Sequence, residues 1–463
     1  MVTQRGIRVM EQRIIAGFEN EKLCMFDIMA FIDGNKCALL NNKNGTMAAV
    51  ERECLDSIES HDIDNELAFF LVQRGLAKYD NSREISENCE VIRPEFFLID
   101  LTKKCNLACK YCFREFADNY PEMSAEMVDC ICNSLIGYWR ENPSLKISIQ
   151  AWGGEPLLCL PLILQIRKRF NEVKLYPQIV METNGTLISQ EVAEKLFENH
   201  IELGISIDGN SKVHDSQRPF VGGQASLAKV EDGIKNLRSV GYTGFGTITV
   251  VTRHTVDHLE DIIEYFVGMS IRSIKFNMMR KNKRNMELAP DIEQFGDYIE
   301  RLLKCMYSLY KKRIPFVEQN IAQRMLNLMY RTNNNICNSY GCHGGYRMLS
   351  IDSKGKIFPC ELSDCEDYCI GTIENNNYIG MVKEAIERNH EYFQKEDIND
   401  CVDCPWRYFC RGGCKAAVKY STGALGNFDK TECAFNKALY PKLVKILLNE
   451  PDYADYLVNG EVL

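Results

Sequence analysis

Three cysteines stand close together in one short segment of the chain. Cys105, Cys109 and Cys112 occupy the sequence CNLACKYC, directly after an apolar run that we expect to form a strand. Three thiolates from one loop can bind three irons of a [4Fe-4S] cluster and leave the fourth iron open to a small molecule that carries an amine and a carboxylate. A structural zinc site or three unrelated buried thiols are the alternatives, but no fourth zinc ligand lies nearby. The spacing therefore favours a cluster with one exchangeable position.

A second group of cysteines fills the C-terminal part of the chain. Its members are Cys342, Cys360, Cys401, Cys404, Cys410, Cys414 and Cys433, four of which follow the spacing CxxCxxxxxCxxxC. Free thiols at this density would be reactive, so metal ligation is the favoured interpretation. A zinc ribbon is the alternative, and counting iron would separate the two. The chain has 21 cysteines, an odd number, and no export signal, which indicates a reducing compartment rather than a disulfide framework.

The sequence CNLACKYCF resembles the signature of the radical S-adenosylmethionine (radical SAM) enzymes. The resemblance implies that S-adenosylmethionine (SAM) chelates the open iron. One-electron reduction of its sulfonium would then yield a 5′-deoxyadenosyl radical that abstracts hydrogen from a substrate. Tyr111 and Phe113, beside the cluster ligands, would wall the adenine, although packing alone would also explain them.

A glycine-rich motif follows the second expected strand. The run Gly153-Gly154-Glu155-Pro156 resembles the GGEP element of the same enzymes. The resemblance implies that the glycines let the backbone approach the methionyl part of SAM, while the Glu155 carboxylate pairs with its ammonium group. Alone, this run would read as an ordinary turn.

Polar residues also end the third and fourth expected strands. By the same resemblance Asn184, Ser206 and Asp208 would contact the carboxylate and ribose of SAM, and Arg218 is a further candidate. Ordinary turn chemistry is the alternative for the Asn-Gly and Asp-Gly pairs. His214, which lies between them and Arg218, could equally be a loop residue or a satisfied core histidine.

The C-terminal cysteines resemble the SPASM domain, an extension of radical SAM enzymes that holds two auxiliary [4Fe-4S] clusters. The resemblance implies that one cluster binds Cys337, Cys342, Cys360 and Cys414, and that the other binds Cys401, Cys404, Cys410 and Cys433. Relatives vary at the position of Cys337, where some leave an open iron, and Cys365 and Cys369 are possible substitutes.

Glu361 follows Cys360 at the place where sulfatase maturases have an aspartate thought to act as a base. A carboxylate beside an auxiliary cluster could deprotonate a substrate thiol or hydroxyl. An exposed glutamate without a role is the alternative.

Alternating apolar and amphipathic segments position these motifs. The expected strands are Phe96–Thr102, Ile147–Trp152, Ile179–Thr183, Leu203–Ile207, Gly246–Val251 and Ile274–Met278, and the helices between them are Ala125–Arg140, Pro161–Val173, Ser189–Asn199, Ser226–Val240 and Thr255–Val267. Strands separated by helices predict a parallel sheet, and their apolar character indicates burial on both faces. We therefore expect an α/β fold, a partial (β/α)6 barrel, with its chemistry at the carboxyl ends of the strands.

Other segments flank this barrel. We expect a small α+β, winged-helix-like module at 1–94, in which the Asn44-Gly45 pair turns a hairpin and a helix lies near Glu66–Gly75. The barrel would cover 95–290, a helical bridge 291–336, the Fe-S domain 337–436 and a closing helix 437–463. Bound metal would organise the cysteine-rich part, which has little periodicity of its own.

Composition excludes several classes of function. The chain has 463 residues and a formal net charge of -9 without a long basic run, so nucleic acid is not an expected partner. Its apolar runs are far shorter than the roughly 20 residues of a membrane span. The N-terminus lacks a secretory signal, and we expect a cytoplasmic enzyme.

These features lead to a hypothesis about the substrate. The N-terminal module resembles the peptide-recognition element of peptide maturases, which binds a leader peptide by extending its sheet, although a cap on the barrel is the alternative. We expect a maturase that installs a thioether or related crosslink in a ribosomally made precursor peptide and receives electrons from a flavodoxin or ferredoxin. The alternatives are a sulfatase-maturase-like or other protein-modifying dehydrogenase, and a non-catalytic Fe-S electron-transfer or binding protein.

Overall fold

The computed structural model describes most of the chain. The described residues are 10–19, 23–41, 44–79, 91–114, 121–282, 284–330, 342–362, 366–389, 392, 398–423, 425 and 427–460. Cys337 and its possible substitute Cys365 lie outside them, so the structure does not place these two predicted ligands.

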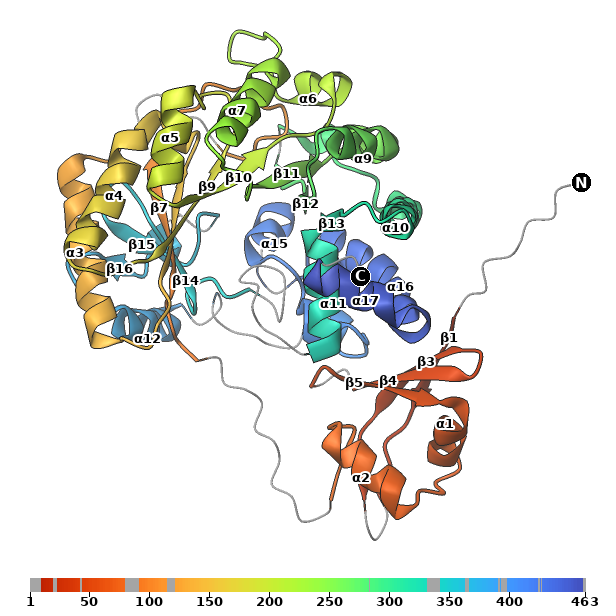
Figure 1. Cartoon of the computed structure of the whole chain (residues 1–463). Helices are drawn as coiled ribbons and strands as arrows, with labels where there is room; N and C mark the ends of the chain where they lie inside the picture. The colour runs from red at the N-terminus through yellow and green to blue at the C-terminus, as the bar shows by residue number, and fades with distance from the viewer. Residues whose placement is uncertain are drawn as a thin grey trace, which may run out of the picture.

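Six parallel strands form the centre of the molecule, and they confirm the six strands expected from the sequence (Figure 1). They are β7 (Phe96–Thr102), β8 (Ser148–Gly153), β9 (Gln178–Thr183), β10 (Ile201–Ser206), β11 (Gly246–Val251) and β12 (Ser273–Met278). Each pairs in parallel with the next along the chain. The carboxyl ends of all six strands therefore lie at one edge of the sheet.

Helices connect these strands and cover one face of the sheet (Figure 1). They are α3 (Ala125–Glu141), α4 (Leu160–Glu172), α5 (Gln190–Glu198), α6 (Ser211–Gln217), α7 (Leu227–Ser239), α8 (Arg253–Asp257) and α9 (Leu259–Gly268). The segment expected as one helix, Thr255–Val267, belongs to two helices, because His258 has non-helical angles (φ -118°, ψ 25°). The open, parallel arrangement agrees with the expected partial barrel.

The sheet extends beyond the six expected strands. On the β7 side it continues with β14 (Met348–Ile351), β15 (Lys356–Phe358) and β16 (Gly371–Thr372), and on the β12 side with β13 (Val317–Glu318). β14 is parallel to β7, so the cysteine-rich region begins as a direct continuation of the barrel sheet. The sequence did not predict these strands, because two to four residues are too few to show a period.

The N-terminal module has its own four-stranded sheet with the order β1-β3-β4-β5, and β2 pairs separately with β6. The elements of the module are β1 (Glu11–Ile15), β2 (Cys24–Met25), β3 (Ile28–Asp33), β4 (Lys36–Asn41), β5 (Thr46–Glu51), α1 (Arg52–Glu59), α2 (Asn65–Gln73) and β6 (Ala77–Lys78). β4 and β5 pair antiparallel around the predicted Asn44-Gly45 turn, where Gly45 has φ +69°. The expected hairpin is confirmed.

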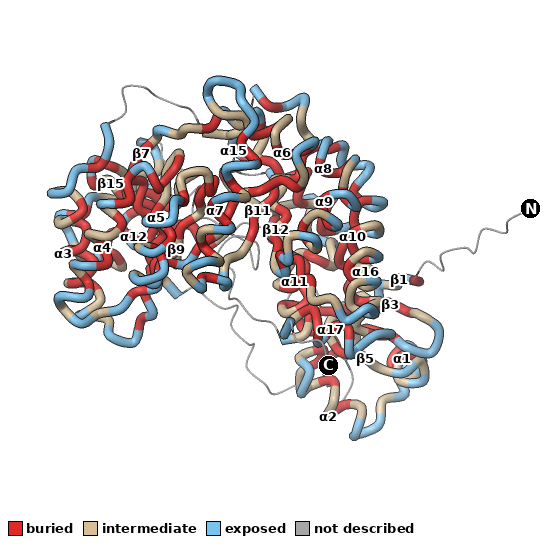
Figure 2. The backbone as a smooth tube through the Cα atoms, turned by 45° about the horizontal axis from the view of Figure 1, so that its top comes forward, coloured by how far each residue is buried: buried red, intermediate tan, exposed pale blue. Residues whose placement is uncertain are grey.

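Four of the other described helices form a second body beside the barrel (Figures 1 and 2): α10 (Phe295–Lys311), α11 (Gln319–Tyr330), α16 (Lys430–Asn449) and α17 (Pro451–Asn459). α12 (Tyr378–Arg388) lies instead against the barrel helix α3, where the Tyr378 hydroxyl is 2.9 Å from Ser134 Oγ. The cysteine-rich region also contains α14 (Arg407–Cys410) and α15 (Lys415–Thr422). The N-terminal module docks on α16, where Lys36 Nζ donates to Leu448 O at 2.8 Å. Within the described part of the chain, no helix is long and apolar enough to cross a membrane.

Candidate functional site

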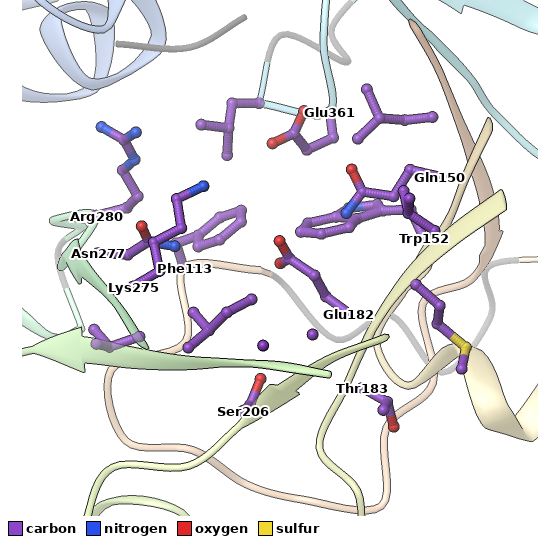
Figure 3. Close-up of a pocket in the computed structure, with 18 of the residues that line it drawn as sticks. Phe113, Gln150, Trp152, Glu182, Thr183, Ser206, Lys275, Asn277, Arg280 and Glu361 are labelled. Atoms are coloured by element: carbon purple, nitrogen blue, oxygen red, sulfur yellow. The ribbon is translucent and has the colours of Figure 1, made fainter. Parts of the chain in front are cut away.

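A cavity of about 840 Å³ lies along the inner face of the parallel strands and reaches their carboxyl ends. Its walls include Cys105, Cys109 and Cys112 from the loop after β7, and Cys342, Cys360 and Cys414 from the C-terminal region. Figure 3 shows polar side chains pointing into it from several strands. The structure therefore brings two of the predicted cysteine groups to one chamber.

The loop that carries Cys105, Cys109 and Cys112 is fixed by backbone hydrogen bonds. Ala108 N donates to Pro219 O at 2.8 Å, and Lys110 N donates to Gln217 O at 2.9 Å. These bonds tie the loop to the last residue of α6 and to the residues that follow it. Burial raises the pKa of Cys109 to about 12, so a positive charge such as iron must compensate for its thiolate form.

The three thiols of this loop share one space. The charges of Cys105, Cys109 and Cys112 act on one another, and all three residues line the cavity. A [4Fe-4S] cluster binds each thiolate to a different iron, so this arrangement suits three of its four irons.

The two glycines of the GGEP motif allow the end of β8 to touch the cysteine loop. Gly154 N donates to Thr102 O at 2.8 Å. A Cβ on Gly154 would lie 2.2 Å from Lys104 O, and one on Gly153 would lie 2.5 Å from Thr102 O. Any side chain here would therefore displace the backbone that leads into Cys105.

Glu155 is fully enclosed and hydrogen-bonded within the protein. Its carboxylate accepts from Thr183 Oγ1 at 2.6 Å, from Asn184 N at 2.7 Å and from Leu157 N at 3.0 Å. Burial raises its pKa, and these three bonds oppose that effect. The carboxylate thus joins the ends of β8 and β9 on the cavity wall, and its pairing with the SAM ammonium remains a prediction.

Asn184 stands beside the first cysteine. Its Nδ2 donates to Asn106 Oδ1 at 2.8 Å and lies 3.9 Å from Cys105 Sγ. Ser206, at the end of β10, lines the same cavity (Figure 3). Both residues therefore lie on the cavity wall, and their contacts with SAM stay a prediction.

Tyr111, Asp208 and Arg218 form one buried group. Tyr111 OH donates to Asp208 Oδ2 at 2.7 Å, and Arg218 Nη1 donates to the same hydroxyl. Tyr111 and Arg218 line the cavity, whereas Asp208 lies behind them with no exposed surface. Asp208 therefore holds Tyr111 in place behind the cavity wall and does not itself reach the cavity surface.

His214 is a satisfied core histidine, which was the simpler of the two interpretations. Its Nδ1 accepts from Asp208 N at 3.2 Å, and its Nε2 is 3.1 Å from Ser226 Oγ. Burial lowers its pKa, so the ring is neutral, as its accepting Nδ1 requires.

The other C-terminal cysteines surround a second, small cavity. Cys401, Cys404, Cys410 and Cys433 all line it, and together they are the four predicted ligands of the second auxiliary cluster. Cys369 donates to Gly371 O at 3.6 Å instead of facing either cavity. Cys342, Cys360 and Cys414 thus line the large cavity and these four cysteines the small one, while the clusters themselves stay a prediction.

Glu361 points into the large cavity from the side opposite β9 (Figure 3). One of its oxygens is buried without a hydrogen-bond partner among the described residues. Burial raises its pKa, while Arg280 and Arg114 act in the opposite direction. Glu361 is thus available to a substrate group, unlike the fully bonded Glu155.

Sequence reasoning missed several charged residues of this cavity. Among them, Glu182 on β9 and Lys275 on β12 extend into it (Figure 3). The sequence did contain a signal for both residues, because a charged residue inside an otherwise apolar parallel strand costs stability unless its side chain faces a binding site.

Comparison with known proteins agrees with this geometry. The Radical SAM superfamily profile matches residues 99–266. An uncharacterized protein of Methanocaldococcus jannaschii is 31% identical over 289 residues, which are 62% of this chain and 91% of that protein. A cysteine-type anaerobic sulfatase-maturating enzyme of Clostridium novyi is 25% identical over 365 residues, which are 75% of this chain and 94% of that enzyme.

Solved structures share the fold. The structure of anSMEcpe with bound AdoMet has a TM-score of 0.67 at 20% identity, covering 79% of this chain and 98% of that one. Streptococcus suis SuiB bound to its precursor peptide SuiA has a TM-score of 0.54 at 16% identity, covering 88% of this chain and all of that one. The cysteine loop, the glycine contact after β8 and these matches together show that the chain belongs to the radical SAM superfamily of enzymes.

Proposed function

We propose that this enzyme is a peptide maturase that abstracts hydrogen from a leader-bearing ribosomal peptide and installs a thioether or related crosslink. The observation that carries the proposal is the shared cavity, whose walls include both the SAM-cluster cysteines and Cys342, Cys360 and Cys414. Its volume of about 840 Å³ lies near the top of the usual range of ligand pockets, roughly 300–1,000 Å³. SAM and a peptide segment would share this space.

The N-terminal module supports a peptide substrate. Residues 1–94 contain a sheet in which β1 is an edge strand, paired on one side only with β3. An edge strand offers free backbone groups to an extended peptide. SuiB, which has the same fold, is a protein whose structure was determined with a bound precursor peptide.

We further propose three [4Fe-4S] clusters. Cys105, Cys109 and Cys112 would hold the SAM cluster, and SAM bound there supplies the 5′-deoxyadenosyl radical. Two auxiliary clusters would use the remaining two groups: Cys337, Cys342, Cys360 and Cys414 for one, Cys401, Cys404, Cys410 and Cys433 for the other. Electrons would pass to and from a flavodoxin or ferredoxin.

Glu361 is our candidate for the base. Forming a C–S bond removes one hydrogen atom from carbon, one proton from the substrate thiol and one electron. The 5′-deoxyadenosyl radical would take the hydrogen atom, Glu361 the proton, and an auxiliary cluster the electron. The variant Glu361→Gln keeps the size of the side chain and removes the base. We expect product formation to fall by about 10²-fold or more. Product formation at the wild-type rate would remove Glu361 from the mechanism.

The experiment that tests the function is anaerobic co-expression with a short cysteine-containing peptide encoded beside the gene, followed by thiol alkylation and mass spectrometry. A thioether predicts the loss of two hydrogens for each crosslink and the loss of one alkylatable thiol. Loss of hydrogen with every thiol still free would indicate a carbon-carbon crosslink or another oxidation. The Cys105→Ala variant, which lacks a ligand of the SAM cluster, is the control and should give unmodified peptide.

A second candidate is a sulfatase-maturase-like protein dehydrogenase. Its support is the 25% identity to the cysteine-type anaerobic sulfatase-maturating enzyme over most of both chains. An unmodified precursor peptide, together with oxidation of a cysteine in a co-expressed sulfatase, would favour this candidate over the first.

A further inference from the structure

Two opposite charges face each other across the depth of the large cavity. Glu182 belongs to β9 and Lys275 to β12, and β10 and β11 lie between these strands. The two strands are three inter-strand spacings apart, about 14 Å when measured along the curved sheet. Figure 3 shows the side chains entering the cavity from opposite sides. The pair therefore brackets a gap instead of closing it.

Glycines keep that gap open. Gly204 on β10 is in register with Glu182, and Gly246 on β11 is in register with Gly204. Both line the cavity. A Cβ on Gly204 would lie 2.9 Å from Ile248 Cδ1, whereas one on Gly246 would meet no atom within 4 Å. Between the two charges the floor is thus glycine backbone at Gly204 and Gly246, with the side chain of Ile248 lying over Gly204.

The two charges do not satisfy each other. Burial raises the pKa of Glu182, and the charge of Lys275 acts against this rise from a distance. Within the described part of the chain, neither side chain makes a hydrogen bond or a close ion pair. Trp152, beside Glu182 in the same cavity, has an indole Nε1 that is buried and equally unpartnered. Glu182 and Lys275 are themselves half-buried and line the cavity, so a ligand inside the cavity can contact both charges.

We propose that Glu182 and Lys275 bind a main-chain peptide group of the substrate, with Glu182 accepting its N–H and Lys275 donating to its C=O. The N–H and C=O of a peptide group point in opposite directions, so one carboxylate and one ammonium on opposite walls match them. A side-chain amide presents both groups at the same end and does not fit this arrangement. This inference rests on the proposed peptide substrate. It adds a contact to the main chain of the substrate that does not depend on the side chain of the reacting residue.

Affinity for the precursor peptide in the SAM-loaded enzyme is the first test. Charge-assisted hydrogen bonds predict about 10-fold or more weaker peptide binding in Glu182→Gln and in Lys275→Met. The charge-swapped double variant, Glu182→Lys with Lys275→Glu, should not restore binding, because the peptide group has a fixed direction. Matched controls are Glu194→Gln and Lys229→Met, which change exposed charges outside the cavity and should bind peptide as the wild type does. Recovery in the swapped variant, or weaker binding of SAM instead of peptide, would overturn the proposal.

Methylation of the peptide identifies the group that is bound. A precursor peptide N-methylated at the reacting residue lacks the N–H donor, so it should bind the wild type more weakly. It should bind Glu182→Met, whose side chain has no oxygen acceptor, with no further loss. A further loss in Glu182→Met equal to that of the wild type would show that Glu182 does not accept this N–H.

Thermal unfolding without peptide separates this proposal from the proposed function. If Glu182 and Lys275 serve to bind a ligand and do not stabilise the fold, Glu182→Gln and Lys275→Met should have an unchanged or higher unfolding midpoint. Lower midpoints in both variants, restored by the charge swap, would show an ion pair that serves folding and would overturn the proposal. If the wild type bound no precursor peptide, the proposed function would fail, and the unfolding midpoints would still decide whether the pair is held for a ligand.

Discussion

The hydroxyl of Tyr111 donates a hydrogen bond to the carboxylate of Asp208 at 2.7 Å, although the two residues lie 97 positions apart in the chain. Tyr111 belongs to the cysteine loop after β7, and Asp208 follows the end of β10. Arg218 donates to the same hydroxyl, and its guanidinium lies 5.8 Å from the centre of the Tyr111 ring. One buried polar group therefore connects the cluster loop to the opposite part of the barrel.

The first prediction concerns this connection. Tyr111→Phe removes the hydroxyl and leaves Asp208 without that donor. We expect the free energy of unfolding to fall by about 1–3 kcal/mol, because a buried acceptor loses a partner. We also expect weaker SAM binding, because the wall formed by Tyr111 and Arg218 is no longer held in place. Urea unfolding and equilibrium SAM binding measure the two effects.

Tyr138→Phe is the matched control for this variant. Tyr138 is as deeply buried, and its hydroxyl donates to Pro94 O at 2.9 Å, but it does not line the cavity. It should lose stability with wild-type affinity for SAM. Equal SAM affinity in Tyr111→Phe and Tyr138→Phe would show that the Tyr111 hydroxyl does not shape the site.

The second prediction is a pH dependence of stability caused by His214. Burial lowers the pKa of this histidine in the folded protein, whereas in the unfolded chain it is near 6.5. Below pH 6.5 the unfolded chain therefore binds more protons at this position, and stability falls as the pH falls. The contribution is about 1.4 kcal/mol for each pH unit below 6.5 until the folded pKa is reached.

The comparison of urea unfolding at pH 7.0 and pH 5.5 measures this loss. In His214→Asn, whose Oδ1 can still accept from Asp208 N, the loss should be smaller by about 1.4 kcal/mol, corresponding to one pH unit. His254→Asn is the control, because His254 is exposed on α8 and should leave the loss unchanged. An identical loss in the wild type and in His214→Asn would assign the acid sensitivity to other groups.

The sequence predicted the barrel and the place of its motifs because long, strongly patterned elements carry their own signal. The strand Phe96–Thr102 was predicted with the bounds that the structure shows. β14 was not predicted, since its four residues have no detectable period and its pairing with β7 is a long-range contact. In the site, sequence motifs led to Asn184 and Ser206, but the burial of Asp208 behind Tyr111 depends on packing that no motif reports.

The third prediction concerns the contact between the glycine motif and the cysteine loop. Gly154→Ala places a methyl group 2.2 Å from the backbone oxygen of Lys104, and a backbone atom cannot move aside without shifting the loop. We expect less iron and sulfide bound per chain after reconstitution and less SAM bound. Gly268→Ala is the control, since a Cβ at that position meets no atom within 4 Å. Full iron and SAM binding in Gly154→Ala would show that the loop tolerates the displacement.

The fourth prediction distinguishes clusters from zinc in the C-terminal region. Three [4Fe-4S] clusters correspond to about twelve irons per chain. Cys401, Cys404, Cys410 and Cys433 line one small cavity, so Cys404→Ala combined with Cys433→Ala removes two of its four thiols. Two remaining thiolates cannot hold a cluster, and iron should fall by about four per chain, while acid-labile sulfide falls equally. Elemental analysis and a sulfide assay after anaerobic reconstitution measure both quantities.

Cys130→Ala is the control for this count, because Cys130 is exposed on α3 and lines neither cavity. It should keep the full amount of iron and sulfide. A zinc site in place of the cluster predicts a different result for the Cys404 and Cys433 variant, namely the loss of one zinc per chain with no change in iron or sulfide. That result would assign these four cysteines to a zinc ribbon and would leave the other two groups of cysteines as the candidate iron sites.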